Sequence, residues 1–186
     1  KVAVCQVFEK VNTGGVSLTV FELVTASFAA EGHDLREDWE GKHDARGTKL
    51  ATGRRDKIHS QDVLKSVGAD ELLQVVTLLV TQDRKKSDPK SPVSCKRVDI
   101  LKLSLADYRA YADRAVAGFL GAGKILFQQK LFSSRDLPYS TQLVPFAATL
   151  AVLGDGAKND AARSKLVRWF WCGVFGELYG GAIETR

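Results

Sequence analysis

Hydrophobic side chains recur at helical spacing through most of this chain. Apolar positions three and four residues apart predict helices over about 20–30, 70–82, 105–127, 140–153 and 160–179. No stretch of any length alternates apolar and polar side chains as a half-buried strand would, and no internal repeat is visible. The pattern therefore predicts an all-α, multi-helix bundle-like domain.

Helix-start signals precede several of these apolar stretches. Thr19, followed three residues later by Glu22, has the pattern of a capping box, in which each side chain satisfies a backbone N–H of the other residue. Asp34 is expected to cap a short polar helix. Ser104 and Asp107 repeat the capping-box pattern at the start of a long helix.

The last helix has the clearest apolar face. We expect Asn159 or Asp160 to cap its start and Gly180 to end it. Its inward-facing positions are predicted to be Leu166, Val167, Phe170, Trp171, Val174, Phe175 and Leu178. The segment 70–82 is apolar over most of its circumference and is predicted to be a central buried helix, although its β-branched Val and Thr leave a strand open.

Two polar stretches carry surplus positive charge. Residues 41–60 are expected to be loop or weak helix, and residues 83–97 a polar linker with two prolines. Either stretch could contact DNA phosphates, and Arg54, Arg55 and Lys57 are the candidate DNA-binding residues. Neither stretch interleaves aromatic residues as a base-stacking surface would, so a solvated loop is the alternative.

Composition bounds the class of protein. The chain has 186 residues and 20.3 kDa, which is enough for one domain with a real core. A formal net charge of +5 and a pI near 9.1 mildly favour an anionic partner. No apolar run is long enough to cross a bilayer, so we expect no membrane partner. Three scattered cysteines, Cys5, Cys95 and Cys172, are expected to be small buried hydrophobes in a reducing cytoplasm.

No constellation of catalytic residues converges in the sequence. His33, His43 and His59 lie in polar surroundings without a matching nucleophile motif. A metal site built from His33 and His43 would add the acidic residues Asp34, Glu37 and Asp38, but solvated surface positions are expected instead, and no metal ligand is assigned. The "GAGK" stretch at 121–124 lacks the frame of a phosphate-binding loop and is predicted to lie inside a helix, which it could kink.

The sequence "NTGG", Asn12, Thr13, Gly14 and Gly15, comes shortly before the first capping box. A glycine pair ahead of a capped helix offers free backbone N–H groups at a positive helix end, which suits an anion. Spacing alone favours an ordinary turn between two helices.

The surrounding segment "FEKVNTGGVSLTVFEL" resembles the Phe-x-x-x-Asn-x-x-Gly-x-x-Leu-x-x-x-Glu-Leu signature of the GmrSD-type restriction family, a ParB-like domain long classed as of unknown function. The positions that match are Phe8, Asn12, Gly15, Leu18, Glu22 and Leu23. Two later stretches, "SRDLPYSTQLVPFAA" and "KLVRWFWCGVFGELYGG", are similar to segments of the same family.

The resemblance implies a role in modification-dependent restriction and phage defence. It implies that Asn12, Thr13, Gly14 and Gly15 line a nucleotide site, and that Glu22 caps a helix rather than acting as a base. In the intact protein it implies an NTP with Mg, an N-terminal ParB/sulfiredoxin-like α+β domain and often a C-terminal HNH nuclease domain. The family's Asp-Gly-Gln-Gln-Arg motif and an HNH pattern are both missing here, so no cofactor and no complete active site are expected in this chain itself.

We therefore expect residues 1–33 to form the end of the nucleotide-site region and residues 34–186 to form a helical body with its linker at 83–97. Because the chain begins at Lys1 inside an amphipathic segment, an upstream portion is expected to precede it. The chain has no Met, so residues missing inside it are also considered. The body would contact DNA or a neighbouring domain. The alternative is a helical interaction module that couples a nuclease to a sensor domain and has no ligand site.

Overall fold

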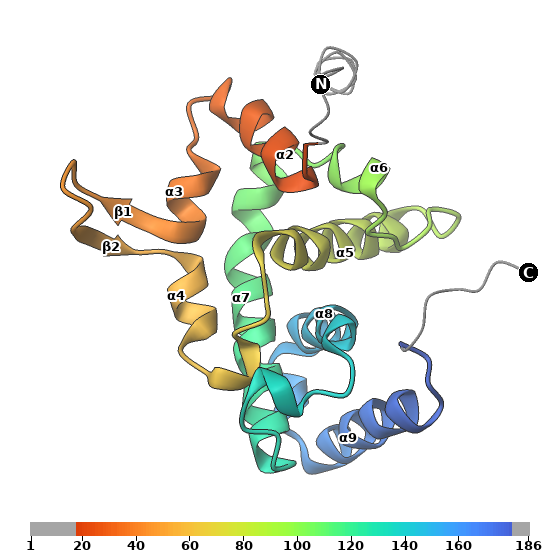
Figure 1. Ribbon diagram of the computed structural model, residues 1–186. Helices are drawn as coiled ribbons and strands as arrows, with labels where there is room; N and C mark the ends of the chain where they lie inside the picture. The colour runs from red at the N-terminus through yellow and green to blue at the C-terminus, as the bar shows by residue number, and fades with distance from the viewer. Residues whose placement is uncertain (1–17, 180–186) are drawn as a thin grey trace, which may run out of the picture. The chain divides into compact units, whose positions relative to one another are not determined.

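The structure is a computed structural model that describes residues 18–179, and the expected all-α class is confirmed apart from one small hairpin (Figure 1). The chain divides into two compact units, which share the helices α4 and α7. Among the described residues, unit 1 holds 18–57 and 68–113, and unit 2 holds 58–67 and 114–179.

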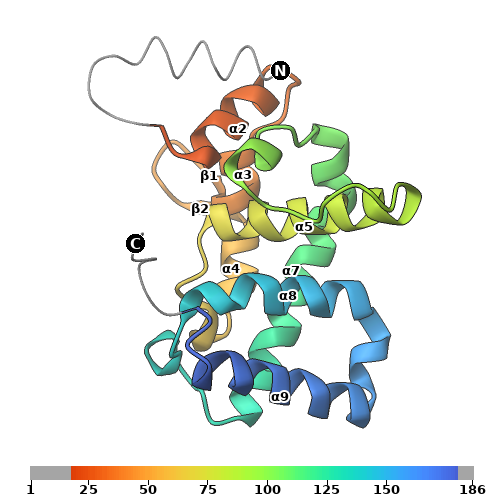
Figure 2. The same cartoon turned by 90° about the vertical axis from the view of Figure 1, so that its right-hand side faces the viewer.

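Unit 1 contains the elements α2 (Val20–Ala29), α3 (Leu35–Glu40), β1 (Gly41–His43), β2 (Lys49–Thr52), α5 (Ala69–Ser87) and α6 (Arg97–Ile100). Unit 2 contains η1 (Asp62–Leu64), η2 (Ser134–Asp136), η3 (Ser140–Gln142), α8 (Leu143–Leu153), η4 (Gly154–Lys158) and α9 (Asp160–Phe175). The shared helices are α4 (Arg54–His59) and α7 (Leu105–Gln128). Figure 2 shows α8 and α9 of unit 2 beside each other.

The predicted caps of unit 1 are confirmed. The Thr19 hydroxyl accepts from the Glu22 N–H at 3.2 Å, and the Glu22 carboxylate accepts from the Thr19 N–H at 2.8 Å. The Asp34 carboxylate accepts from the Glu37 N–H at 2.9 Å and starts α3. These bonds satisfy N–H groups that the first turn of a helix leaves without an intrahelical partner.

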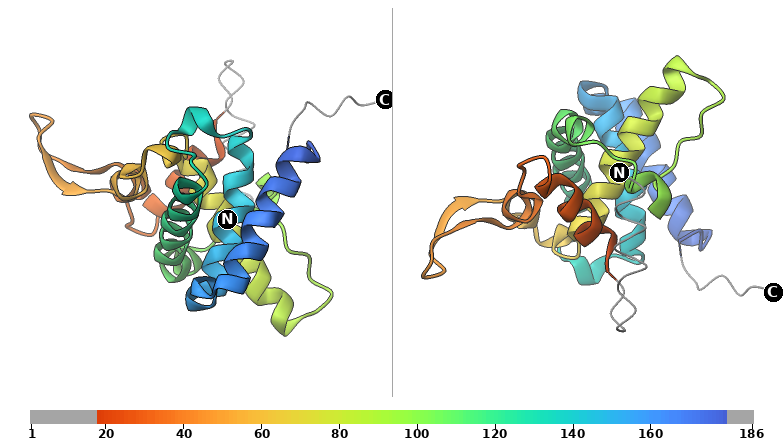
Figure 3. Two further views of the ribbon diagram at one scale, coloured as in Figure 1. Left: turned by 90° about the horizontal axis from the view of Figure 1, so that it is seen from below. Right: turned by 90° about the horizontal axis from the view of Figure 1, so that it is seen from above.

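The prediction of loop or weak helix over 41–60 is right for α4 but wrong for 41–52, which forms an antiparallel hairpin. Its strands extend away from the helices of unit 1 (Figure 3). Most of their side chains are exposed on both faces, so no alternation of apolar and polar residues marks them in the sequence. The Asp44 carboxylate holds the turn by accepting from the N–H groups of Arg46 and Thr48.

The central buried helix is confirmed as α5, and the strand alternative is wrong. The helix runs five residues into the predicted linker, as far as Ser87. Beyond it, the chain is tied back to α5 because the Thr81 hydroxyl donates to the Ser94 carbonyl at 3.1 Å and accepts from the Ser94 N–H at 3.2 Å.

The long helix α7 starts at the predicted capping box, where the Ser104 hydroxyl accepts from the Asp107 N–H at 3.0 Å. Its glycines do not divide it. Gly118 lets α8 approach closely, because a Cβ there would collide with the Ala147 carbonyl oxygen. Gly123 leaves room for the Gln61 side chain, whose amide donates to the Leu120 carbonyl at 3.1 Å.

Unit 2 is completed by α8 and α9. Pro145 lies in the first turn of α8, where a missing N–H removes no intrahelical hydrogen bond. Asn159 caps α9 by accepting from the N–H groups of Ala161 and Ala162, as predicted. The helix ends at Phe175 with Gly176 as its C-cap, so the expected end at Gly180 is wrong. The apolar face of α9 is only partly buried: Leu166 and Phe170 are in the core, but Phe175 and Leu178 are 81% and 74% exposed. For those last two positions the prediction of burial is wrong.

A search of the described helices finds none with the length and apolar character needed to cross a membrane.

Gly118 and Gly121 offer a matched test of the α7–α8 packing. Gly118→Ala should lower the free energy of unfolding by about 1–3 kcal/mol, because the added methyl group overpacks the helix crossing. Gly121→Ala should leave stability unchanged or raise it by up to about 1 kcal/mol, because its Cβ would lie 3.8 Å from Leu150 and alanine favours a helix. Urea unfolding of the two variants measures the difference. Equal destabilisation would contradict the close approach.

Candidate functional site

The predicted nucleotide-site residues Asn12, Thr13, Gly14 and Gly15 lie outside the described residues. The helix that follows them is described, and its Glu22 carboxylate is engaged as a cap. Hydrogen bonds from the Thr19 N–H and hydroxyl hold the pKa of Glu22 below its ordinary value. This use of the carboxylate agrees with a capping role rather than a base.

Arg54, the first predicted DNA-binding residue, is held by carboxylates of unit 1. Its Nε donates to Asp38 at 2.6 Å and its Nη1 donates to Asp113 at 2.5 Å. The Tyr108 hydroxyl donates to the same Asp38 oxygen at 2.5 Å, and the guanidinium lies 5.7 Å from the centre of the Tyr108 ring. Arg54 therefore joins α3, α4 and α7 within this unit.

Burial and hydrogen bonds both shift the pKa values of this network. Burial opposes the charge of Arg54, but hydrogen bonds to Asp38 and Asp113 outweigh it and raise the pKa of the guanidinium. Burial, reinforced by Asp38, raises the pKa of Tyr108, so the phenol stays protonated and donates. His33 packs its ring 5.8 Å from Tyr108, and its Nε2 is buried without a hydrogen-bond partner among the described residues.

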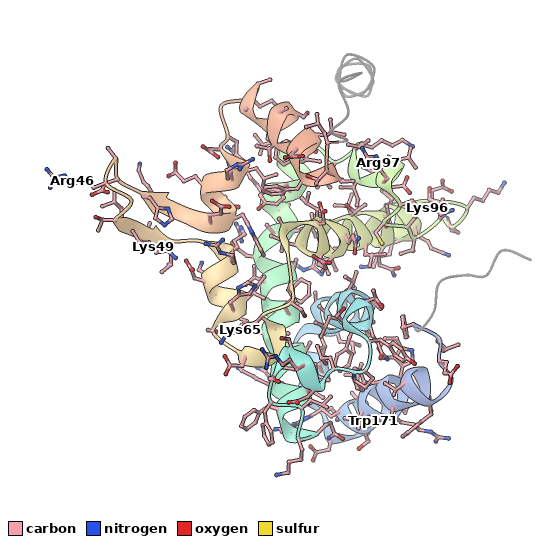
Figure 4. The ribbon with its side chains drawn as sticks, viewed as in Figure 1. Arg46, Lys49, Lys65, Lys96, Arg97 and Trp171 are labelled. Carbon is pink, nitrogen blue, oxygen red and sulfur yellow. The ribbon has the colours of Figure 1, made fainter. Side chains whose placement is uncertain are left out.

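Basic residues also lie on the hairpin that precedes α4. Arg46 extends from the tip of the hairpin, with Lys49 on the next strand (Figure 4). Asp56 bonds to Lys49 and accepts from the Gly53 N–H at 2.9 Å, so it is engaged locally. The remaining predicted DNA-binding residues, Arg55 and Lys57, lie on α4 directly after this turn.

The net positive charge of the described chain lies in unit 2. The described residues of unit 1 hold fifteen Lys or Arg and fifteen Asp or Glu, so their formal charges cancel. Those of unit 2 hold nine Lys or Arg against five Asp or Glu. An anionic partner is therefore attracted more strongly by the surface of unit 2 than by that of unit 1.

A cleft of about 650 Å³ in unit 2 concentrates this charge, and we call it the cationic cleft. It lies between α7, the end of α8, η4 and the start of α9. The charged residues that line it are Arg114, Lys124, Asp155, Lys158 and Arg163. Gly121 opens its floor, because no side chain projects there.

The contacts in the cationic cleft leave the charges of Lys124 and Arg163 without a carboxylate partner among the described residues. Asp155 pairs with Lys158 at 2.6 Å, in an exposed contact between neighbouring turns. Arg163 donates to the Gln128 amide oxygen, a neutral group. Arg114 donates to the Ala151 carbonyl at 3.4 Å. Within residues 18–179 no ion pair or hydrogen bond engages the Lys124 side chain. Such a surface can hold several phosphate groups.

The sequence alone predicts no ligand for the residues of this cleft. "GAGK" lies inside α7, as predicted, and its Gly121 and Lys124 line the cationic cleft. The available signal was the spacing of Arg114, Gly121, Lys124 and Gln128 along one helix face. The cations contributed by η4 and α9 come from 30 or more residues further on, and only the fold brings them together.

Possible metal ligands and reactive thiols are the remaining candidate groups. In the part of the chain that the structure describes, no three His, Cys, Asp or Glu side chains are grouped to hold a metal. Cys95 is half-buried and Cys172 exposed, both as free thiols, so the expectation of burial is wrong for Cys172. The third cysteine, Cys5, lies outside the described residues. Burial raises the pKa of Cys95, which makes its thiol less reactive.

Comparison of the chain with protein families, with curated proteins and with solved structures finds no match. The similarity to the GmrSD-type family therefore stays a prediction that rests on the residues quoted for it.

Arg54 and Arg55 provide a matched pair for the network of unit 1. Arg54→Ala should lower the free energy of unfolding by about 1–3 kcal/mol, because two carboxylates lose their partner in a partly buried site. Arg55→Ala should change it by less than about 0.5 kcal/mol. Chemical denaturation of both variants measures the effect. Similar stabilities for the two variants would show that the Arg54 contacts are not structural.

Proposed function

We propose that this chain is the helical part of a GmrSD-type, modification-dependent restriction protein that acts in phage defence in the cytoplasm, and that its unit 2 contacts DNA. The family and its role rest on the signature around Asn12 and Gly15. The observation that carries the DNA contact is the cationic cleft, where four Lys or Arg side chains face one Asp.

The chemistry of this contact is binding to the phosphate backbone. Lys124 is a point charge on a flexible stem, whereas Arg163 presents a planar fork that matches two phosphate oxygens. Such contacts fix a nucleic acid in place without reading its sequence. Recognition of a modified base would then be the task of another part of the intact protein, and cleavage that of its HNH nuclease domain.

The nucleotide role belongs to the same proposal. Asn12, Thr13, Gly14 and Gly15 would face the phosphates of an NTP bound with Mg, in a site completed by the ParB-like domain. Thr19 and Glu22 support this geometry indirectly, because their capping box starts a helix shortly after the glycines.

A second candidate is an interaction module that couples a nuclease to a sensor domain. The observation that favours it is the exposure of Phe175, the last residue of α9, and of Leu178 in the turn that follows. Such a module would need no ligand, so the affinity of the chain for DNA separates the two candidates.

Reversing charges in the cationic cleft tests the DNA contact. Lys124→Glu with Arg163→Glu should weaken binding to a labelled DNA duplex by more than about tenfold at low salt and reduce the salt slope by about two phosphate contacts. Lys165→Glu with Arg168→Glu makes the same change of net charge on α9 outside the cleft, and should retain the slope. Fluorescence anisotropy against salt concentration measures both. Equal losses in the two double variants would refute a defined site.

Asn12→Ala tests the nucleotide loop in the intact protein. NTP hydrolysis should fall by at least about tenfold while the melting temperature stays unchanged, because one side chain of a phosphate-facing loop is lost without a change in the core. Hydrolysis assays with and without Mg give the result. Hydrolysis that does not depend on Asn12 would contradict the nucleotide site and favour the alternative, in which "NTGG" is an ordinary turn between helices.

A further inference from the structure

An exposed aromatic pair lies next to the cationic cleft. The rings of Phe127 and Phe132 meet edge to face with their centres 5.0 Å apart, and the side chains are 60% and 48% exposed. Single exposed hydrophobic side chains are common on protein surfaces, but two large rings packed together in solvent indicate a contact surface.

The backbone fixes this pair. Lys130 ends α7 in the left-handed conformation, with φ of 66°, a position that glycine usually occupies. The Leu131 N–H donates back to the Leu126 carbonyl at 3.1 Å, which turns the chain and returns Phe132 to Phe127. The Asp136 carboxylate then accepts from the Phe132 N–H at 2.9 Å. The rings are therefore placed before any ligand arrives.

A second pocket of about 540 Å³ opens beside the two rings. Its other wall is formed by Ser60–Val63, the segment that includes the start of η1. A nucleobase is flat, aromatic and polar at its edge, so it suits a site that offers ring faces and a few polar side chains. Both requirements are met by Phe127 and Phe132 with Gln61 nearby.

The two sites are continuous. Lys124 and Gln128 line both the cationic cleft and the aromatic pocket. A nucleotide whose base lies on the rings therefore has its phosphate beside Lys124. The remaining cations of the cleft exceed what one phosphate needs, and they suit the neighbouring phosphates of a strand.

We propose that unit 2 binds single-stranded nucleic acid, with its phosphates in the cationic cleft and one unpaired base stacked on Phe127 and Phe132. This proposal rests on the proposed function of the cleft and adds the class of ligand. Only an unpaired base exposes both of its faces to aromatic side chains, so a paired duplex would use the cleft alone.

The test uses the full chain with three probes: a labelled 12-nucleotide single strand, the corresponding duplex, and AMP as competitor. Phe127→Leu with Phe132→Leu should weaken single-strand binding between about 5-fold and 100-fold and leave duplex binding within about 2-fold. Phe127→Tyr alone should retain single-strand affinity, because it keeps an aromatic ring at position 127. Phe175→Leu removes an exposed ring from α9 and should have no effect.

The possible failures are distinguishable. Unchanged single-strand binding in the double Leu variant, or an equal loss for the duplex, would overturn base stacking while leaving the cleft intact. If AMP competes as tightly as the strand, the proposal of a strand as ligand is overturned, and the ligand is a free nucleotide. Indifference of every probe to Lys124→Glu with Arg163→Glu would overturn the proposed function itself. Melting curves of each variant identify any loss of affinity that comes from unfolding.

Discussion

The close crossing of α7 and α8 at Gly118 is the constraint on which unit 2 depends. Because position 118 has no side chain, the backbone of α8 can approach α7 at Ala147. Further along the same helix face, Gly121 meets only the Leu150 side chain, and the space widens into the cationic cleft. The η4 turn then brings Lys158 across from α7. Small residues thus set both the packing and the opening beside it.

Electrostatics follow different rules in the two units. In unit 1, Arg54 forms ion pairs with Asp38 and Asp113, and these pairs stabilise the fold. In unit 2, Arg163 is oriented by the neutral amide oxygen of Gln128, so its charge stays available to a ligand. A partly buried guanidinium with two carboxylates stabilises structure, whereas exposed cations oriented by neutral groups attract anions.

Much of the helical fold could be predicted, because capping and periodicity are local. Thr19 with Glu22 and Ser104 with Asp107 mark helix starts through bonds between residues three apart. The hairpin could not be predicted, because its exposed strands carry no alternation. Exposure of Phe175 was also missed, since periodicity names a face without saying whether another element covers it.

The candidate site shows the same limit. The neighbouring basic residues predict DNA binding by Arg54, but in the fold its side chain has two carboxylate partners from other helices. The cationic cleft joins Lys124 to Arg163, and no local pattern connects residues so far apart in the chain. Local rules therefore locate helices, whereas a binding surface depends on which of their faces meet.

The most direct measurement is photo-crosslinking of a reactive DNA strand to the full chain, followed by mass spectrometry of the attached peptides. Crosslinks should concentrate in residues 114–132 and 154–163, which contribute to the cationic cleft and the aromatic pocket beside it. Crosslinks confined to the hairpin and α4 at residues 41–59, or spread evenly over the surface, would contradict the proposed site.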